Sequence, residues 1–251
     1  MSMPFFTKYE MSDIFQQGQV LAFDKPLTWT SFNLVAKVRW MISKHIGAKL
    51  KVGHAGTLDP LATGVLIICT GKATKQIDQL QAGVKEYVAT LKLGATTPSF
   101  DLEKEIDAVY PTDHITRAMI DDVLRSFVGE IMQVPPVFSA VKVDGKRAYD
   151  LARKGKDVEL KAKPLRIDEI ECLSYDPALQ ELTIRVVCSK GTYIRALARD
   201  IGEALQSGAH LTALRRTRVG DFTLDKCFAG IEDFEQFLAN QPLSSQHSAN
   251  S

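Results

Sequence analysis

The chain has 251 residues, of which 45% are hydrophobic and 24% charged, enough for one sizeable core or two small ones. No stretch approaches the ~18 consecutive apolar residues of a membrane span, and the first ten residues lack the pattern of a signal peptide. The four cysteines are scattered, without a C-x-x-C pair or a histidine at ligand spacing, so we expect reduced thiols in a cytoplasmic protein and no zinc site.

The net charge is only +1, but it is unevenly distributed along the chain. Residues 25–85 carry nine Lys or Arg against two acids, 101–130 carry eight acids against three bases, and 142–166 carry nine bases against four acids. Such asymmetry gives a folded molecule a basic side that suits a polyanion. Charge runs are at least as often solvated faces without a partner. Charge alone therefore decides neither way.

The first elements along the chain are expected to be a strand and a helix. Val20–Phe23 is a short apolar run that ends in a turn at residues 24–26, as a strand does. Apolar residues at helical spacing follow Thr30 and Ser31, either of which can cap the helix, and Gly47 is placed to stop it.

Beyond this helix the pattern predicts a loop and several strands. The breaker-rich segment Gly53–Gly64 is expected to be a structured loop, and Val65–Cys69, which lies between glycines, a buried strand. Tyr87–Leu93 and Leu182–Val186 alternate apolar with other residues, so each predicts a strand with one apolar face.

Two further helices are indicated by their caps. Thr116 is expected to begin a helix whose start Ile115 and Ile120 can staple, and Thr192 to cap a helix that ends near Gly208. Strands and helices are interspersed without a regular βαβ repeat. We therefore expect an α+β fold around a mixed sheet.

Asp59 is the first candidate catalytic residue. An Asp before Pro is a turn residue far more often than a catalyst. Here, however, three glycines in twelve positions allow a close approach of the backbone, and Thr57 and Thr63 keep the surface uncrowded. Pro60 biases Asp59 towards an extended backbone, and the apolar strand that follows provides a rigid support. The segment is suited to presenting a carboxylate beside a cleft.

A phosphate-binding P-loop is the obvious alternative for a glycine-rich segment, and the details exclude it. Gly71-Lys72 is followed by Ala73 where Ser or Thr is needed, and no glycine precedes at the required spacing.

Arg195 is the second unusual residue. If Thr192 is the cap, Arg195 lies in the first helical turn, where the macrodipole disfavours a cation by a few tenths of a kcal/mol. A partly buried arginine needs an anionic partner, and a catalytic carboxylate would serve. The alternative is a surface arginine in an ion pair.

Several segments together resemble the motifs of the bacterial pseudouridine synthases that modify uridine 55 of tRNA. The resemblance runs from about Val20 to Val219 in the family's order. It is carried by 53–64 (GHAGTLDPLATG), 85–87 (KEY), 188–195 (CSKGTYIR), 210–216 (HLTALRR) and, between them, 135–142 (PPVFSAVK) and 145–149 (GKRAY).

The resemblance implies the pseudouridine synthase fold: a long, mixed, mostly antiparallel sheet with flanking helices and a central catalytic cleft. It divides the chain into an N-terminal extension (1–19) and a catalytic domain (20–239) with an RNA-gripping insertion at about 128–165. The segment 240–251 is rich in Ser, Gln and Asn, and this composition predicts a disordered tail. It also implies isomerisation of uridine 55 in the T loop, with the target base flipped out and no metal, nucleotide or redox cofactor. The implied partner is the T-arm stem-loop of tRNA, with no membrane, no protein partner and a monomeric state.

The same resemblance assigns roles to individual residues. Asp59 would be the nucleophilic carboxylate, Tyr87 would stack on the flipped uracil, and Arg195 would hold Asp59 ionised. The residues implied to bind substrate are Lys25, His54, Tyr193, Leu214, Lys146 and Arg147. Of these, Leu214 would close the pocket and His54 would stack in the space that the base vacates. For His54, a structural histidine in a glycine turn is the alternative.

The sequence departs from the family pattern in two places. Thr28 stands where a glycine usually follows the Asp-Lys-Pro turn, so this turn is expected to differ. After Arg216 only about 35 residues remain, too few for the family's usual C-terminal RNA-binding domain, which we expect to be missing.

Two other classes of function compete with this interpretation. An RNA-binding or tRNA-folding module without catalysis would explain the basic stretches, but not Asp59, Tyr87 and Arg195 together. An enzyme acting on a small molecule would leave the basic insertion without a purpose.

Overall fold

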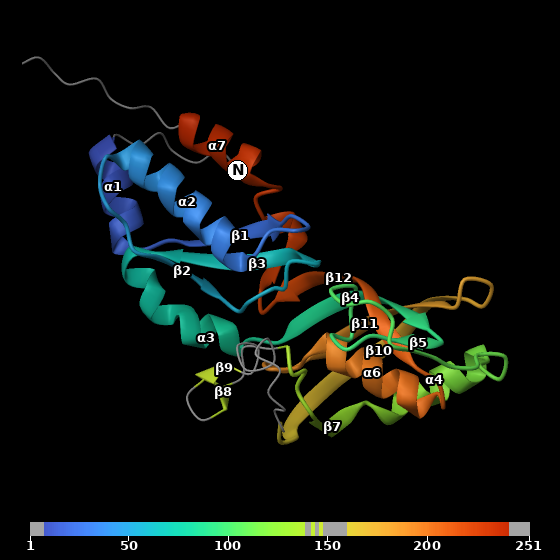
Figure 1. Cartoon of the computed structure of the whole chain (residues 1–251). Coiled ribbons are helices and arrows are strands. Elements are labelled where there is room, and N and C mark those ends of the chain that lie inside the picture. Colours follow the sequence, from blue (N-terminus) through green and yellow to red (C-terminus); the bar gives the residue numbers. More distant parts are fainter. Residues whose placement is uncertain (1–7, 139–141, 144–145, 148–159, 241–251) are drawn as a thin grey trace, which may run out of the picture. The chain divides into compact units, whose positions relative to one another are not determined.

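The computed structural model describes residues 8–138, 142–143, 146–147 and 160–240 (Figure 1). The chain divides into two compact units. Unit 1 comprises the residues up to Ala82 and those from Arg218 onward, and unit 2 is the continuous stretch Gly83–Thr217. Unit 2 is therefore an insertion between the two parts of unit 1.

Unit 1 has a small antiparallel sheet with β3 at its centre. Strand β1 pairs with one edge of β3, from Val20 opposite Cys69 to Lys25 opposite Gly64, and β2 pairs with the other. The elements of unit 1 are α1 (Lys8–Gln17), β1 (Val20–Lys25), α2 (Ser31–Ile46), β2 (Val52–Ala55), β3 (Ala62–Thr70), the 3-10 helix η1 (Gly71–Gln76), α3 (Ile77–Ala82), β13 (Phe222–Thr223), the 3-10 helix η2 (Leu224–Lys226) and α7 (Ile231–Ala239).

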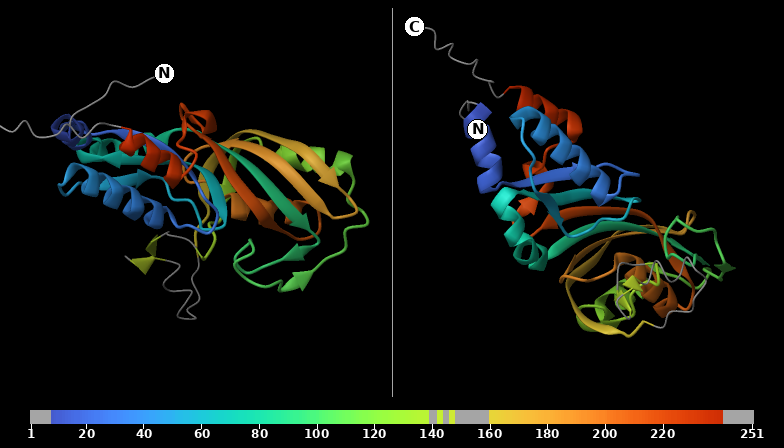
Figure 2. Two further views of the ribbon diagram at one scale, coloured as in Figure 1. Left: turned by 90° about the horizontal axis from the view of Figure 1, so that it is seen from above. Right: turned by 60° about the vertical axis from the view of Figure 1, so that its left-hand side comes forward.

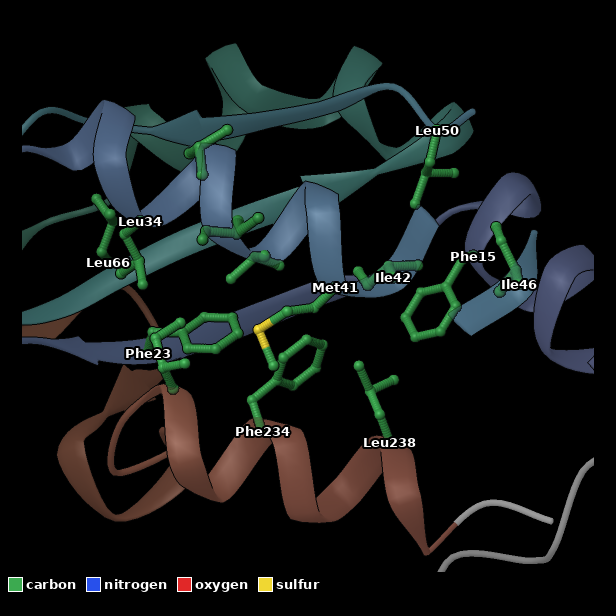
Figure 3. Close-up of a cluster of buried hydrophobic side chains, with 14 residues drawn as sticks. Phe15, Phe23, Leu34, Met41, Ile42, Ile46, Leu50, Leu66, Phe234 and Leu238 are labelled. Atoms are coloured by element: carbon green, nitrogen blue, oxygen red, sulfur yellow. The ribbon is translucent and has the colours of Figure 1, made fainter. Parts of the chain in front are cut away.

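The core of unit 1 joins segments from both ends of the chain. Figure 3 shows Met41 of α2 beside Phe23 of β1 and Phe234 of α7, with Phe15 of α1 further along the same cluster. The rings of Phe23 and Phe234 meet edge to face with centroids 5.1 Å apart. Each large apolar side chain buried in this way contributes about 1.5–3 kcal/mol, so α7 is an integral part of the unit.

Helix α2 begins and ends where its sequence predicts. The Thr30 side chain accepts a hydrogen bond from the Asn33 N–H, and the Asn33 side chain accepts one from the Thr30 N–H, which completes a capping box. At the other end Gly47 adopts the left-handed conformation, with φ of 70°, which a residue without Cβ reaches at no steric cost.

Unit 2 is built on a longer sheet with the strand order β12-β4-β11-β10-β7. The pairs β4–β11, β11–β10 and β10–β7 are antiparallel. The elements are β4 (Lys85–Leu93), β5 (Ala95–Thr96), β6 (Ala108–Val109), α4 (Arg117–Ser126), β7 (Gly129–Gln133), β8 (Lys142–Val143), β9 (Lys146–Arg147), β10 (Lys163–Asp176), β11 (Glu181–Cys188), α6 (Ile194–Ala204) and β12 (Ala209–Val219), whose last two residues belong to unit 1.

The two faces of this sheet differ in character. Helices α4 and α6 lie on one face, where α6 contacts β4 and α4 contacts β10 (Figure 1; Figure 2). The buried positions of β4 and β11 alternate as the sequence predicts, with Tyr87 opposite Val186. On strand positions of the opposite parity, Arg185 bridges Glu86 at 2.7 Å and Glu169 at 2.8 Å.

The expected α+β fold with mostly antiparallel strands is confirmed, and several boundaries differ from the expectation. The predicted loop Gly53–Gly64 is shorter, because β2 and β3 extend into it and leave residues 56–61. The predicted N-terminal extension contains helix α1, which buries Phe15 in the core. Thr116 caps α4 as predicted, accepting from the Met119 N–H.

Two predicted regions are described only in part. Residues 128–165 include β7 and the start of β10, which pair with each other. Between these strands the description covers only 134–138, 142–143, 146–147 and 160–162. The tail 241–251, predicted to be disordered, lies outside the described residues. None of the helices that the structure describes is long and apolar enough to cross a membrane.

Candidate active site

Asp59 lies in the six-residue loop 56–61 between β2 and β3, half-buried. The residue before it is fixed by Ser31, the buried first residue of α2. The Leu58 N–H donates to Ser31 Oγ at 2.8 Å, and Ser31 Oγ donates to the Leu58 carbonyl at 3.1 Å. One hydroxyl thus satisfies both backbone groups of Leu58 and ties the loop to the start of a helix.

The residues at and after this position are fixed in the same way. The Thr28 N–H donates to the Pro60 carbonyl at 2.8 Å, and the Ala62 N–H donates to the Asp59 carbonyl at 3.1 Å. Three consecutive residues, Leu58 to Pro60, therefore have backbone groups held by hydrogen bonds. The backbone around Asp59 is therefore rigid, as Pro60 and the apolar strand that follows it predict.

Thr28 occupies the position where the family pattern has glycine, and its backbone explains that pattern. Its φ is +69°, in the left-handed region that β-branched residues rarely adopt. That conformation costs an L-residue about 1–2 kcal/mol and glycine almost nothing. A glycine at this position could adopt the same backbone without strain.

Lys25 and His54, both predicted to bind substrate, lie within the framework of unit 1. Lys25 is fully buried, and its Nζ donates to the carbonyl oxygens of Pro26 (2.8 Å) and Trp29 (2.6 Å), so it braces the turn that contains Thr28. His54 is half-buried in strand β2, opposite Ile68. Contact of either with substrate stays a prediction.

In unit 2 the helix that carries Arg195 starts one residue later than predicted. The N-cap of α6 is Tyr193 and not Thr192, whose hydroxyl donates to the Ser189 carbonyl instead. The Tyr193 N–H donates to Gln133 Oε1 at 2.9 Å, and Gln133 Nε2 donates to the Tyr193 carbonyl at 3.2 Å. A buried glutamine from β7 therefore binds the backbone at the helix start, and Arg195 remains in the first turn.

The Arg195 guanidinium is buried among oxygen atoms. Nη1 donates to the Ser99 carbonyl at 3.2 Å, Nη2 donates to the Phe138 carbonyl at 3.0 Å, and Nε lies 3.7 Å from Asp101 Oδ2. Both side chains of the Arg195–Asp101 pair are more than 90% buried. These oxygens offset the unfavourable position of a cation at a helix N-terminus.

Asp101 is a residue that the sequence does not single out. It ends a tight loop in which Thr97 Oγ1 donates to the Asp101 carbonyl at 2.7 Å, and the Glu103 N–H donates to Asp101 Oδ1 at 2.9 Å. Phe100 within this loop has a φ of +63°. The only signal in the sequence is a short polar run after a strand, which does not indicate a partner on a helix some 94 residues later.

Tyr87 and Lys85 lie on the buried face of β4. Tyr87 is 8% exposed and Lys85 5%. Lys85 Nζ donates to the Gly83 carbonyl at 2.6 Å. Burial, together with the nearby Arg216, lowers the pKa of Lys85 to about 8.

Leu214 is half-buried on β12, the strand that contains the motif at 210–216. The same strand is tied to the loop that holds Arg195, because the Leu211 N–H donates to the Phe100 carbonyl at 2.9 Å. His210 Nδ1 lies 2.9 Å from the Ala95 carbonyl. The backbone of this motif therefore holds the loop that contacts the Arg195 guanidinium.

Lys146 and Arg147 form the two-residue strand β9, which pairs with β8. The arrangement of their side chains lies outside the described part of the structure, so their contact with RNA stays a prediction. Among the described residues, no group of three or more His, Cys, Asp or Glu is placed to hold a metal ion.

The predicted site residues fall into both units. Lys25, His54 and Asp59 belong to unit 1, and Tyr87, Tyr193, Arg195 and Leu214 to unit 2. Within unit 2, Arg195 has a carboxylate partner in Asp101. The predicted pairing of Arg195 with Asp59, a residue of the other unit, stays a prediction.

Two family models match the chain. Residues 43–194 match the TruB family pseudouridylate synthase (N terminal domain), and residues 195–246 match the tRNA pseudouridylate synthase B C-terminal domain. The matches cover Asp59, Tyr87 and Tyr193 in the first model and Arg195 and Leu214 in the second.

Curated relatives are similar over nearly their whole length. The chain is 68% identical to tRNA pseudouridine synthase B of Phocaeicola vulgatus over 230 residues, which cover 91% of this chain and 97% of the relative. It is 64% identical to the protein of the same name from Bacteroides thetaiotaomicron over 239 residues, covering 94% and 99%. A Mycobacterium bovis protein of that name is 48% identical over 82% of this chain and 68% of its own length.

Solved structures show the same fold in longer chains. One chain of a crystal structure of a Cbf5-Nop10-Gar1 complex is 32% identical with a TM-score of 0.68, covering 92% of this chain and 58% of the other. A chain of an H/ACA RNP bound to a substrate RNA containing 2'-deoxyuridine is 29% identical with a TM-score of 0.64, covering 94% and 59%. The chain therefore spans less than two thirds of the length of either.

Proposed function

Because this chain belongs to the TruB family of pseudouridylate synthases, we propose that it converts uridine 55 in the T loop of tRNA to pseudouridine, with Asp59 as the nucleophile. The observation that carries the assignment of Asp59 is the loop 56–61, whose backbone is held by hydrogen bonds on both sides of the carboxylate. Hydrogen bonds hold the backbone of Leu58, Asp59 and Pro60, so the carboxylate is presented from a fixed position.

The proposed reaction is an isomerisation. The bond between uracil N1 and ribose C1′ breaks, and a bond between uracil C5 and C1′ forms. The hydrogen on C5 leaves as a proton and N1 gains one, so mass and oxidation state are unchanged. A carboxylate suits this chemistry because it can form a covalent adduct with one half of the nucleoside while the uracil turns over.

Arg195 is proposed to stabilise the charged form of Asp59. The two backbone carbonyls and Asp101 hold its guanidinium in one orientation, so little rotamer freedom is lost when the substrate binds. Tyr87 would stack on the flipped uracil, and Leu214 would close the pocket around it. Tyr87 is buried and Leu214 half-buried on strands of one sheet, which supports a positioning task for both.

The remaining predicted residues are proposed to bind the T arm. His54 would stack in the space that the base leaves, while Lys25, Tyr193, Lys146 and Arg147 would contact the loop and its phosphates. Catalysis would take place in the cytoplasm, by a monomer that needs no membrane or protein partner.

An RNA-binding module without catalysis is the competing function. A T-arm hairpin labelled with tritium at C5 of its target uridine separates the two, because only isomerisation releases that hydrogen to water. We expect release by the purified protein alone, in proportion to pseudouridine mapped at the target position. Tight binding of the hairpin without release would show that the chain is a binding module.

A further inference from the structure

Helix α2 lies in the most basic stretch of unit 1. The 34 residues between Asp24 and Asp59 contain six Lys or Arg and no Asp or Glu. Three of the six, Lys37, Arg39 and Lys44, are on α2 itself. A helix of 16 residues without one acidic side chain is an uncompensated source of positive potential.

The basic residues lie opposite the face that builds the core. Figure 3 shows Leu34, Met41 and Ile42 of α2 pointing into the hydrophobic cluster. Helical spacing turns the positions on the opposite side of the helix outward. Phe32 is 68% exposed and Trp40 52%, and Arg39 and Lys44 are exposed with them. This face therefore combines cations with large aromatic side chains.

Trp40 organises the two lysines on either side of it. The Lys37 ammonium lies 4.8 Å from the centroid of the Trp40 ring, and the Lys44 ammonium lies 5.0 Å from it. At 1.5 Å per residue the two lysines are separated by about 10.5 Å along the helix axis. Cation–π contacts thus hold two ammonium groups in a row along one face.

A hollow adjoins the N-terminal end of this row. It has a volume of about 410 Å³ and is lined by Thr28, Trp29, Asn33 and Lys37. Its walls offer an indole ring, an amide and an ammonium group. The capping box engages Asn33 through its Oδ1 atom, so the amide nitrogen is not needed for the cap. An aromatic surface beside a cation suits a nucleobase attached to its phosphate.

The fold gives these cations no evident structural task. Lys44 complements the negative end of the helix dipole, but Lys37 and Arg39 lie too far from that end. Within the described part of the chain, no ion pair involves any of the three. The charge is therefore available to a polyanion.

We propose that the outer face of α2, defined by Asn33, Lys37, Arg39, Trp40 and Lys44 together with the hollow at Trp29, binds the substrate tRNA. The three cations contact backbone phosphates, and the hollow takes one unpaired nucleotide. This surface is distinct from the residues assigned to the T arm above. The inference rests on the proposed function for the identity of the RNA.

The chain supplies its own reporter for this surface, because its two tryptophans, Trp29 and Trp40, both lie there. Trp40→Phe leaves Trp29 as the emitter at the hollow, and Trp29→Phe leaves Trp40 between the lysines. Titration with unmodified tRNA should change the emission of both variants, with the midpoint of the tRNA Kd. Emission that stays constant while tRNA binds would overturn the proposal.

A charge variant tests the phosphate contacts. Lys37→Ala with Lys44→Ala should weaken tRNA binding by about ten-fold at 0.1 M salt and flatten the slope of log affinity against log salt by about 1.4–1.8 units. The matched control, Lys104→Ala with Lys226→Ala, removes two exposed lysines that lie outside the basic stretches 25–85 and 142–166 and should leave the slope unchanged. Equal slopes in the two double variants would also overturn the proposal.

Two measurements together, tritium release and the salt dependence of tRNA binding, separate this inference from the proposed function. The wild-type protein is assayed in parallel for tritium release from the T-arm hairpin. Release from the hairpin with an unchanged salt slope in the α2 variant would leave the enzyme assignment standing and remove the α2 surface. A flattened slope without release would keep the surface and remove the enzyme.

Discussion

Asp59 in unit 1 and Arg195 in unit 2 are immobilised by opposite means. The Asp59 loop is held through its backbone, by Ser31, Thr28 and the turn to Ala62. Arg195 is held through its guanidinium, which bonds to two carbonyl oxygens and lies beside Asp101.

The difference separates two ways of making a rigid site. Hydrogen bonds to a residue's backbone persist when its side chain is exchanged for an isostere. A side chain that makes several buried hydrogen bonds is different. Substituting it leaves its partners unsatisfied, so the free energy of unfolding falls together with the reaction rate. Substitutions at the two places should therefore differ in kind as well as in size.

The largest effect is expected for Asp59→Asn. The variant should lose more than ~10³-fold in single-turnover rate, since an amide cannot act as the nucleophile. It should bind tRNA within a few-fold of wild type. Quench-flow with saturating enzyme and a filter-binding titration measure the two quantities. A rate near that of wild type would remove Asp59 from the chemistry.

Asp101→Asn should reduce the same rate by about 10–100-fold, through misplacement of Arg195. The amide preserves the acceptor for the Glu103 N–H but removes the charge beside Arg195. The tRNA Kd should change little, which distinguishes a positioning residue from an RNA contact. Asp113→Asn, at an exposed position of the same unit, is the charge-matched control. Equal rates for both variants would contradict the role of Asp101.

Ser31→Ala tests the backbone clamp directly. It leaves the buried N–H of Leu58 without its acceptor, which should cost about 1–3 kcal/mol in the free energy of unfolding. Ser43→Ala makes the same change on α2 at a half-buried position that holds no loop. Urea denaturation compares the two. The clamp interpretation fails if both variants unfold at the same urea concentration.

Lys85→Met should change the pH dependence of stability. Because the folded pKa of Lys85 is lowered to about 8, the folded state loses a proton that the unfolded state keeps up to about pH 10.4. Wild type should therefore gain stability relative to the variant as pH rises above 8, by up to about 1.4 kcal/mol per pH unit. Denaturation curves at pH 7, 8 and 9 measure the difference. Equal pH dependence in the wild type and the variant would contradict the lowered pKa of Lys85.

Thr28→Gly should have the smallest effect, a gain of about 0.5–1 kcal/mol in the free energy of unfolding. Glycine relieves the left-handed strain, and part of that gain is offset by the entropy of its unfolded chain. Thr28→Ala keeps a Cβ and should give no comparable gain. Thermal melts of the three proteins show whether the strain is real.

The elements that the sequence predicts correctly are those whose signals are local. Thr30, Thr116 and Gly47 mark helix ends by hydrogen bonds or a backbone angle that their own neighbours complete. The alternation from Lys85 to Leu93 marks a strand face in the same way. In contrast, α1 is polar except for a few positions, and its helix depends on packing Phe15 against distant segments.

For the site, the sequence leads to Asp59, Tyr87 and Arg195 and misses what holds Arg195. Gln133 binds the backbone at the start of α6 from a strand 60 residues earlier, so the predicted cap at Thr192 is wrong by one residue. Asp101 reaches Arg195 only through the fold of unit 2. Long-range partners of this kind leave no periodicity or spacing that a single sequence could show.

The insertion of unit 2 within unit 1 has a consequence for the order of folding. Unit 2 is continuous, so it can fold as soon as Thr217 leaves the ribosome. Unit 1 must wait for Phe234, which packs on Phe23 more than 200 residues away. At 5–20 residues per second, the ~150 residues between Ala82 and α7 take roughly 7–30 s to synthesise. Throughout that time the nascent first half keeps its apolar face uncovered, which makes it the natural client of a chaperone at the ribosome.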